Sequence, residues 1–193
     1  MASKIPISVA GFPFVKRLMK YDNKFQPSVN RAQIQDLCSL RFIENKENIL
    51  FYGTPGLGKT HLATAIGIEA ASKRYLTYFI SCHDLIRNLR NAYNESRLEA
   101  RLKHYNKYKV LIIDEIGYLS IDQLGAKLFF QLITKRYEHN STIITTNQPF
   151  SKWGDIFSDA ILDRLLHHSH IVKIVRSSYR AKDVYEVILK ENK

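Results

Sequence analysis

Residues 53–60 form a glycine-rich motif, Gly53-Thr54-Pro55-Gly56-Leu57-Gly58-Lys59-Thr60, that matches G-x-x-x-x-G-K-[ST] at every fixed position. The apolar run 48–52 before it predicts a buried strand, and residues 59–72 after it predict a helix. Glycines let the backbone N–H groups of such a loop turn toward phosphate oxygens, and the helix N-terminus adds a positive dipole. The sequence therefore predicts a nucleotide-phosphate site, in which Lys59 contacts the β- and γ-phosphates and the Thr60 hydroxyl ligates Mg²⁺.

Two acidic residues lie at the end of another predicted strand. The strand 110–114 is a continuous apolar run that ends in Asp114, and Glu115 comes next. We expect Asp114 to hold Mg²⁺, directly or through water. Glu115 is the natural general base to polarise a water for attack on the γ-phosphate. The adjacent acids favour hydrolysis of the nucleotide over its transfer to a small acceptor.

Strands and helices alternate along the rest of the chain. Helices are predicted at 30–42, 59–72, 83–107 with a break at 94–96, 121–138, 160–167 and 183–190. Strands are predicted at 48–52, 76–81, 110–114, 142–146 and 170–175. This alternation predicts an α/β fold with a five-stranded parallel sheet between helices. We expect residues 1–29 to be an N-terminal arm packed on the core and residues 30–193 to form one domain.

Two further polar residues are candidates for the site. Asn147 follows the strand 142–146, at the sheet edge where ligands of open parallel sheets lie, and could orient the attacking water. The alternative is a turn asparagine before Pro149. Arg164 lies on a short helix before the last strand and could reach the γ-phosphate held by a neighbouring subunit. The alternative is an ion pair within the chain, with Asp163 or Asp159.

Composition limits the class of protein. The chain has 193 residues, 45% of them hydrophobic, and a formal net charge of +11 from 29 basic and 18 acidic residues. A folded domain this basic usually has a polyanionic partner; we favour nucleic acid, against an anionic membrane or an unpartnered basic surface. No run approaches ~18 apolar residues, so we expect no membrane span. Cys38 and Cys82 are too few for a disulfide framework, which favours a cytoplasmic protein.

The helical segment 83–107 is the candidate DNA-binding surface. It holds six basic residues against three acidic ones, Asp84, Glu95 and Glu99. Basic residues on outward helix faces suit phosphate contacts, which are largely independent of base sequence. The alternative is a solvated helical face. The six predicted double-stranded DNA contacts are Arg87, Arg90, Arg97, Arg101, Lys103 and Lys107.

Taken together, these features make the sequence similar to those of the AAA+ ATPases in the bacterial initiator and helicase-loader clade. Within that clade the sequence most resembles the IstB-like ATP-binding proteins, the helper ATPases of insertion-sequence transposition. The resemblance covers nearly the whole chain, and its most specific parts are Asp163-Arg164-Leu165-Leu166-His167-His168 and Ser178-Tyr179-Arg180. It also includes Gly11-Phe12-Pro13-Phe14, His61-Leu62-Ala63, Leu111-Ile112-Ile113-Asp114-Glu115 and Asn147-Gln148-Pro149-Phe150.

The resemblance implies roles for several residues. It implies that Asn147 has a sensor-1 role and that Arg164 is an arginine finger that acts on a neighbouring subunit. It also implies that Arg180 is a further nucleotide sensor and that His61 lies beside the phosphate loop, residues 53–60. It places an initiator-specific helical insertion at 83–107 and implies no separate C-terminal lid domain. Family members carry an additional N-terminal module that contacts the transposase, and we expect it to be absent from this chain, which begins close to the ATPase core.

The function implied is that of an ATP-hydrolysing helper that forms an ATP-dependent oligomer on DNA and activates or targets a transposase. A replicative helicase loader of the DnaC/DnaI type is the alternative, because the nucleotide motifs cannot separate the two. A GTPase should carry N-K-x-D where residues 147–150 read Asn-Gln-Pro-Phe, and a small-molecule kinase usually has a lid insertion, which the sequence lacks.

Overall fold

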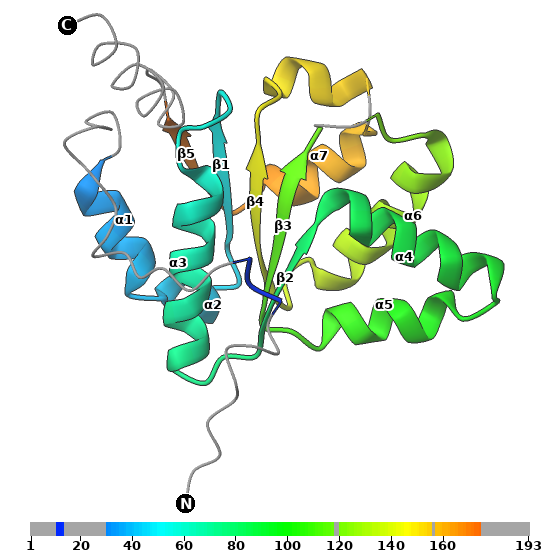
Figure 1. Cartoon of the computed structure of the whole chain (residues 1–193), viewed down its shortest axis with the longest axis horizontal. Coiled ribbons are helices and arrows are strands. Elements are labelled where there is room, and N and C mark those ends of the chain that lie inside the picture. The colour runs from blue at the N-terminus through cyan, green and yellow to red at the C-terminus, as the bar shows by residue number, and fades with distance from the viewer. Residues whose placement is uncertain (1–10, 14–29, 118–119, 156, 175–193) are drawn as a thin grey trace, which may run out of the picture.

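The computed structural model describes residues 11–13, 30–117, 120–155 and 157–174 (Figure 1). The strands are β1 (Asn48–Gly53), β2 (Thr77–Ser81), β3 (Val110–Ile116), β4 (Ser141–Thr146) and β5 (Ser169–Ile174). The α-helices are α1 (Arg31–Cys38), α2 (Arg41–Glu44), α3 (Lys59–Ser72), α4 (Cys82–Asn94), α5 (Leu98–Asn106), α6 (Gln123–Arg136) and α7 (Asp159–Leu166). A 3-10 helix, Phe150–Asp155, precedes α7.

The five strands form one parallel sheet in the order β2-β3-β4-β1-β5. The central strands β3, β4 and β1 consist mostly of buried residues, as expected where a parallel sheet is covered on both faces. The edge strand β5 is less buried and leaves Ile171 exposed. The predicted α/β class and the five-stranded parallel sheet are confirmed.

Helices cover both faces of this sheet (Figure 1). One hydrophobic core joins α1, α2 and α3 to the face that carries Ile49 and Phe51. The other joins α4, α5, α6 and α7 to the face that carries Leu50 and Ile113. The alternation of Ile49, Leu50 and Phe51 between the two cores is the two-residue period of a strand buried on both sides.

The strand order brings the predicted site residues to one edge of the sheet. β3, β4 and β1 are neighbours and run in the same direction, so their carboxyl ends lie side by side. The phosphate loop follows β1, and Asn147 follows β4. The acid pair, Asp114 and Glu115, lies near the end of β3. Ligands of open α/β sheets bind at this edge.

Several helices begin or end at residues other than those predicted from the sequence. The helix expected at 30–42 is two helices, because Leu40 takes a left-handed conformation (φ 67°) between α1 and α2. Asn30 does cap α1, accepting from the Gln33 N–H at 3.2 Å. The segment 83–107 breaks as expected, with Ser96 left-handed (φ 55°) between α4 and α5. The helix expected at 121–138 is shorter, because Asp122 caps it and it ends at Arg136. The helix expected at 183–190 lies outside the described residues.

Part of the expected N-terminal arm lies on the core. A Cβ on Gly11 would lie 2.8 Å from the Phe79 carbonyl oxygen, so residue 11 lies directly against the edge strand β2. Phe12 packs over Gly67 of α3 and joins that core. Gly11 and Phe12 therefore lie against β2 and α3. The rest of 1–29, apart from residue 13, is outside the described residues.

The composition predicts no disulfide framework and no membrane-spanning helix. Cys38 and Cys82 are free thiols, one half-buried and the other buried. Within the described ranges, no helix has both the length and the apolar character needed to cross a bilayer.

Candidate nucleotide-binding site

The phosphate loop curls tightly between β1 and α3. A Cβ on Gly53 would lie 2.2 Å from the Ile174 carbonyl oxygen, so only glycine fits where β1 leaves the sheet. Gly58 has φ 84° and is the N-cap of α3, without a side-chain cap. A helix N-terminus of this kind presents backbone N–H groups and a positive dipole to an anion.

Lys59 lies inside this loop. Its ammonium donates hydrogen bonds to the carbonyl oxygens of Gly53 at 2.7 Å and Thr54 at 2.8 Å, and the residue is only 9% exposed. These contacts hold a positive charge at the mouth of the loop, where phosphates of a nucleotide would lie. His61, on the first turn of α3, is half-buried.

Thr60 and Asp114 are in direct contact. The Thr60 hydroxyl lies 2.9 and 3.2 Å from the two carboxylate oxygens of Asp114, to which it donates. Burial raises the pKa of the Asp114 carboxyl, while hydrogen bonds from Thr145 and Thr60 oppose that rise. A hydroxyl and a carboxylate provide the hard oxygen donors that Mg²⁺ prefers, so the residues present fit this ion.

Glu115 is exposed and has an unusual backbone conformation. Its φ is 63°, and its backbone N–H donates to the Thr145 hydroxyl oxygen at 2.9 Å. No sequence pattern singles out Thr145, because threonine is common in strands for its shape alone. Asp114 and Glu115 both line a cleft of about 720 Å³ between α4 and the segment that follows β3.

Asn147 lies at the same edge of the sheet. Its side-chain oxygen is buried and has no hydrogen-bond partner among the described residues. Buried amide oxygens are nearly always paired, so this atom is available to a ligand or a water. The loops after β3 and β4 are joined beside it, because Gln148 donates to the Gly117 carbonyl at 3.0 Å.

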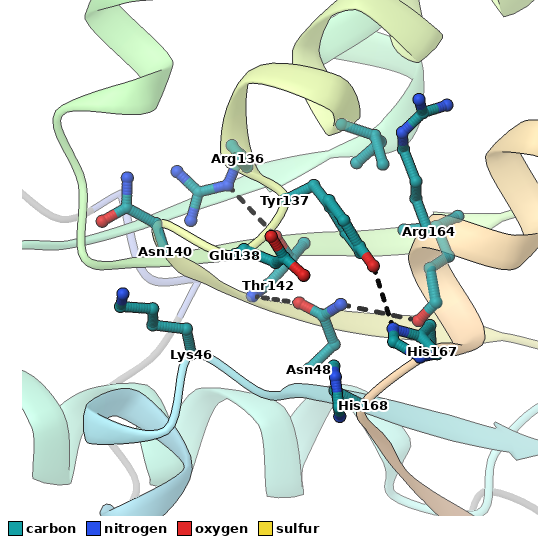
Figure 2. Close-up of a pocket in the computed structure, with 12 residues that line it drawn as sticks. Lys46, Asn48, Arg136, Tyr137, Glu138, Asn140, Thr142, Arg164, His167 and His168 are labelled. Carbon is teal, nitrogen blue, oxygen red and sulfur yellow. Dashed lines mark hydrogen bonds between the residues drawn. The ribbon is translucent and has the colours of Figure 1, made fainter.

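Arg164 lines a pocket with Asn48 (Figure 2), which begins β1, so it lies at the end of the sheet opposite the phosphate loop. Its neighbour Leu165 accepts from Asn48 at the start of β1, whereas the phosphate loop follows the end of β1. Five strand steps separate these ends by roughly 16 Å, so Arg164 cannot contact its own phosphate loop. Its guanidinium lies 5.0 Å from the centre of the Phe130 ring and donates to the Ala160 carbonyl.

The ion pair expected as the alternative role of Arg164 is not formed. Among the described residues, no salt bridge joins Arg164 to Asp159 or Asp163. Figure 2 shows the Arg164 guanidinium pointing away from Tyr137 and His167, which are hydrogen-bonded to each other at 2.9 Å. A cation stacked on an aromatic ring and half-exposed remains free to contact a second molecule.

The basic residues of α4 and α5 do not form one continuous row of unpaired charges. Arg87 pairs with Asp84 at 2.7 Å, and Arg90 pairs with Asp122 at 2.5 Å. Arg97 pairs with Glu95 and precedes α5 instead of lying on it. Arg87 and Arg90 line the cleft beside Glu115.

The remaining members of the predicted DNA surface lie on or next to α5. Arg101 and Lys103 are exposed on the helix, and Lys107 follows it with its ammonium 5.1 Å from the centre of the Tyr108 ring. The predicted surface is therefore divided between the cleft and α5. Arg180 lies outside the described residues.

The strand order, the helical insertion between β2 and β3, and the phosphate loop beside Asp114 and Glu115 define a P-loop nucleotide-binding fold with a DnaA/DnaC-like AAA+ core. A family model described as IstB-like ATP binding protein matches residues 3–186. The chain belongs to this family, the insertion-sequence-associated IstB-like ATP-binding proteins.

Relatives of known sequence agree with this assignment. The chain is 58% identical to an insertion sequence IS232 protein of Bacillus thuringiensis subsp. berliner, over 96% of this chain and 75% of that protein. It is 48% identical to an insertion sequence IS5376 protein of Geobacillus stearothermophilus, over 92% of this chain and 72% of that one.

Among solved structures, the DnaC helicase loader is similar with a TM-score of 0.65 and 24% identity, over 86% of this chain and 97% of that chain. AMPPCP-bound DnaA from Aquifex aeolicus is similar with a TM-score of 0.64 and 24% identity, over 84% of this chain and 52% of that chain. At this identity the likeness is one of fold.

Proposed function

We propose that this chain is a Mg²⁺-dependent ATPase that hydrolyses ATP to ADP and phosphate and acts as a DNA-bound helper of a transposase. The observation that carries the ATPase proposal is the direct contact of Thr60 with Asp114, which joins the phosphate loop to the acid pair. Membership in the IstB-like ATP-binding family and the insertion-sequence origin of its relatives support the transposition role.

Each residue of the site has a part in this reaction. The loop 53–58 and the N-terminus of α3 bind the phosphates, and Lys59 moves its charge from the loop carbonyls onto the β- and γ-phosphates. Thr60 and Asp114 hold Mg²⁺, which neutralises charge on the phosphate oxygens when it is bound. Glu115 takes a proton from the attacking water. Asn147 orients that water with its otherwise unpaired side-chain oxygen.

Arg164 acts on the nucleotide of a neighbouring subunit. Two observations support a role in trans. Arg164 lies at the end of the sheet opposite the phosphate loop, and it has no acidic partner among the described residues. A guanidinium brought to the γ-phosphate stabilises the charge that develops there. This proposal requires ATP-dependent self-association, and we assign Arg180 as a further contact to nucleotide.

DNA binding is proposed for the α4–α5 insertion. The net charge of +11 and the exposed cations on this insertion support phosphate contacts with double-stranded DNA that are largely independent of sequence. The residues proposed are Arg87, Arg90, Arg97, Arg101, Lys103 and Lys107. A helicase-loader function is the second candidate, supported by the similarity of fold to the DnaC helicase loader.

Two measurements test this proposal. Lys59→Ala should abolish tight ATP binding, because it removes the cation that faces the phosphates; unchanged affinity would refute the phosphate site. Co-purification separates the two biological roles. Recovery of a transposase with the chain supports the helper role, whereas recovery of a hexameric helicase supports the loader role.

A further inference from the structure

The acid pair lies at an irregularity in the sheet. In the β3–β4 register Ile113 lies opposite Ile144 and Ile116 lies opposite Thr146. Two residues of β3, Asp114 and Glu115, therefore face a single residue of β4, which is Thr145. This is the arrangement of a β-bulge, in which one strand holds an extra residue.

The bulge explains how two successive acids reach the same cleft. Successive side chains of a regular strand point to opposite faces of the sheet. Asp114 and Glu115 instead both line the cleft beside α4. The left-handed backbone of Glu115, rare for a residue other than glycine, is the local change that allows this.

A single hydroxyl group holds both acids in this arrangement. The Thr145 hydroxyl donates to the Asp114 carboxylate at 2.5 Å and accepts from the backbone N–H of Glu115 at 2.9 Å. A threonine hydroxyl has one hydrogen to donate, and here it goes to the carboxylate while a lone pair receives the amide. Thr145 is fully buried, so water does not replace either bond.

We propose that Thr145 is a positioning residue that fixes the general base relative to the Mg²⁺-holding carboxylate. It contacts no reacting atom itself: it orients Asp114 through the carboxylate and Glu115 through the backbone. This inference rests on the roles proposed above for Asp114 and Glu115. The contacts within the protein that Thr145 makes are independent of those roles.

Isosteric substitution tests the proposal. Thr145→Val keeps the shape of the side chain and removes both hydrogen bonds, whereas Thr145→Ser keeps the hydroxyl. Thr64→Val is the matched control, because Thr64 is equally buried and its hydroxyl has no hydrogen-bond partner among the described residues. Each variant is assayed in the full chain for kcat, for KM for ATP, and for backbone hydrogen exchange at Glu115.

Thr145→Val should lower kcat by roughly 10²-fold with KM for ATP within about threefold, because positioning affects the reaction more than binding. Its Glu115 amide should exchange at least about tenfold faster than in the wild type. Thr145→Ser should restore both kcat and protection to within about fivefold, and Thr64→Val should change neither.

Equal losses in Thr145→Val and Thr145→Ser would overturn the proposal, as would unchanged kcat and exchange in Thr145→Val. If Thr145→Val does not fold, Thr145→Ala is compared with Thr145→Ser against the same criteria. A wild-type protein that binds ATP without hydrolysing it would refute the proposed function, while the exchange measurement would still decide whether Thr145 holds Glu115.

Discussion

The Thr60 hydroxyl donates to the Asp114 carboxylate at 2.9 Å, although the two residues are 54 positions apart in the chain. This contact joins the end of the phosphate loop to the end of β3. It results from the strand order, which places β4 alone between β3 and β1. Each motif is contiguous in sequence, but only the sheet brings their oxygen atoms together.

The first prediction concerns that contact. Asp114→Asn keeps the shape of the side chain and removes its negative charge, so Mg²⁺ loses a carboxylate that would hold it directly or through water. We expect ATP hydrolysis to fall by about 10²-fold or more, and the effect of Mg²⁺ on ATP affinity to be lost. Calorimetry with Mg²⁺ or with EDTA measures the affinity. The exposed Asp159→Asn is the control, and an Mg²⁺ effect retained in Asp114→Asn would contradict the metal assignment.

A second prediction concerns Arg164. Arg164→Ala should leave ATP binding by isolated subunits intact and lower hydrolysis by the assembled protein by a factor on the order of 10³. Mixing it with Glu115→Gln should restore part of the activity, because each variant supplies what the other lacks at a shared site. Absence of recovery at every mixing ratio would count against a site between subunits.

The third prediction concerns stability. Arg136 is 1% exposed, and burial lowers the pKa of its guanidinium. It donates to the carbonyl oxygens of Tyr105, Tyr108 and Ser141 and to the Thr142 hydroxyl. Arg136→Met should lower the free energy of unfolding by at least about 3 kcal/mol, because three buried carbonyls lose their donors.

Urea denaturation measures this effect. The control Arg101→Met replaces an exposed arginine and should change stability by no more than about 0.5 kcal/mol. Equal stability of the two variants would show that Arg136 does not hold the ends of α5 and α6 to the start of β4.

The fourth prediction concerns DNA. Replacing Arg87, Arg90, Arg97 and Arg101 with alanine should weaken binding similarly for all sequences and flatten the salt dependence by up to ~0.9 per lost phosphate contact. ATP binding should survive. The control replaces four other exposed cations with alanine, which changes the net charge equally: Arg41, Lys73, Lys109 and Lys152. If both quadruple variants bind DNA alike, the insertion is not the binding surface.

The sequence predicts the features that lie within continuous stretches of residues. Strand and helix periodicity identified the parallel sheet, and the phosphate loop and Asp114–Glu115 were recognisable because each is a short motif beside a strand. The helix break at Leu40 was missed because no glycine or proline marks it; a leucine takes the left-handed conformation there.

Features that depend on how distant segments meet could not be predicted. The role of Thr145 depends on the β3–β4 register and its bulge, which no local pattern reveals. The pairing of Arg90 with Asp122 joins residues 32 positions apart, so the spacing of arginines along α4 gives no sign of it. Helical spacing shows which arginines share a face of the helix, but it does not show which acidic residues pair with them.

Glu115 is proposed as the base that activates water for hydrolysis of bound ATP. The decisive experiment is single-turnover hydrolysis by the wild type and Glu115→Gln, with ATP affinity measured in parallel. Because the amide cannot accept the proton, we predict affinity within about threefold of the wild type and hydrolysis slower by roughly 10²–10⁴-fold. Hydrolysis by Glu115→Gln at the wild-type rate would contradict the claim.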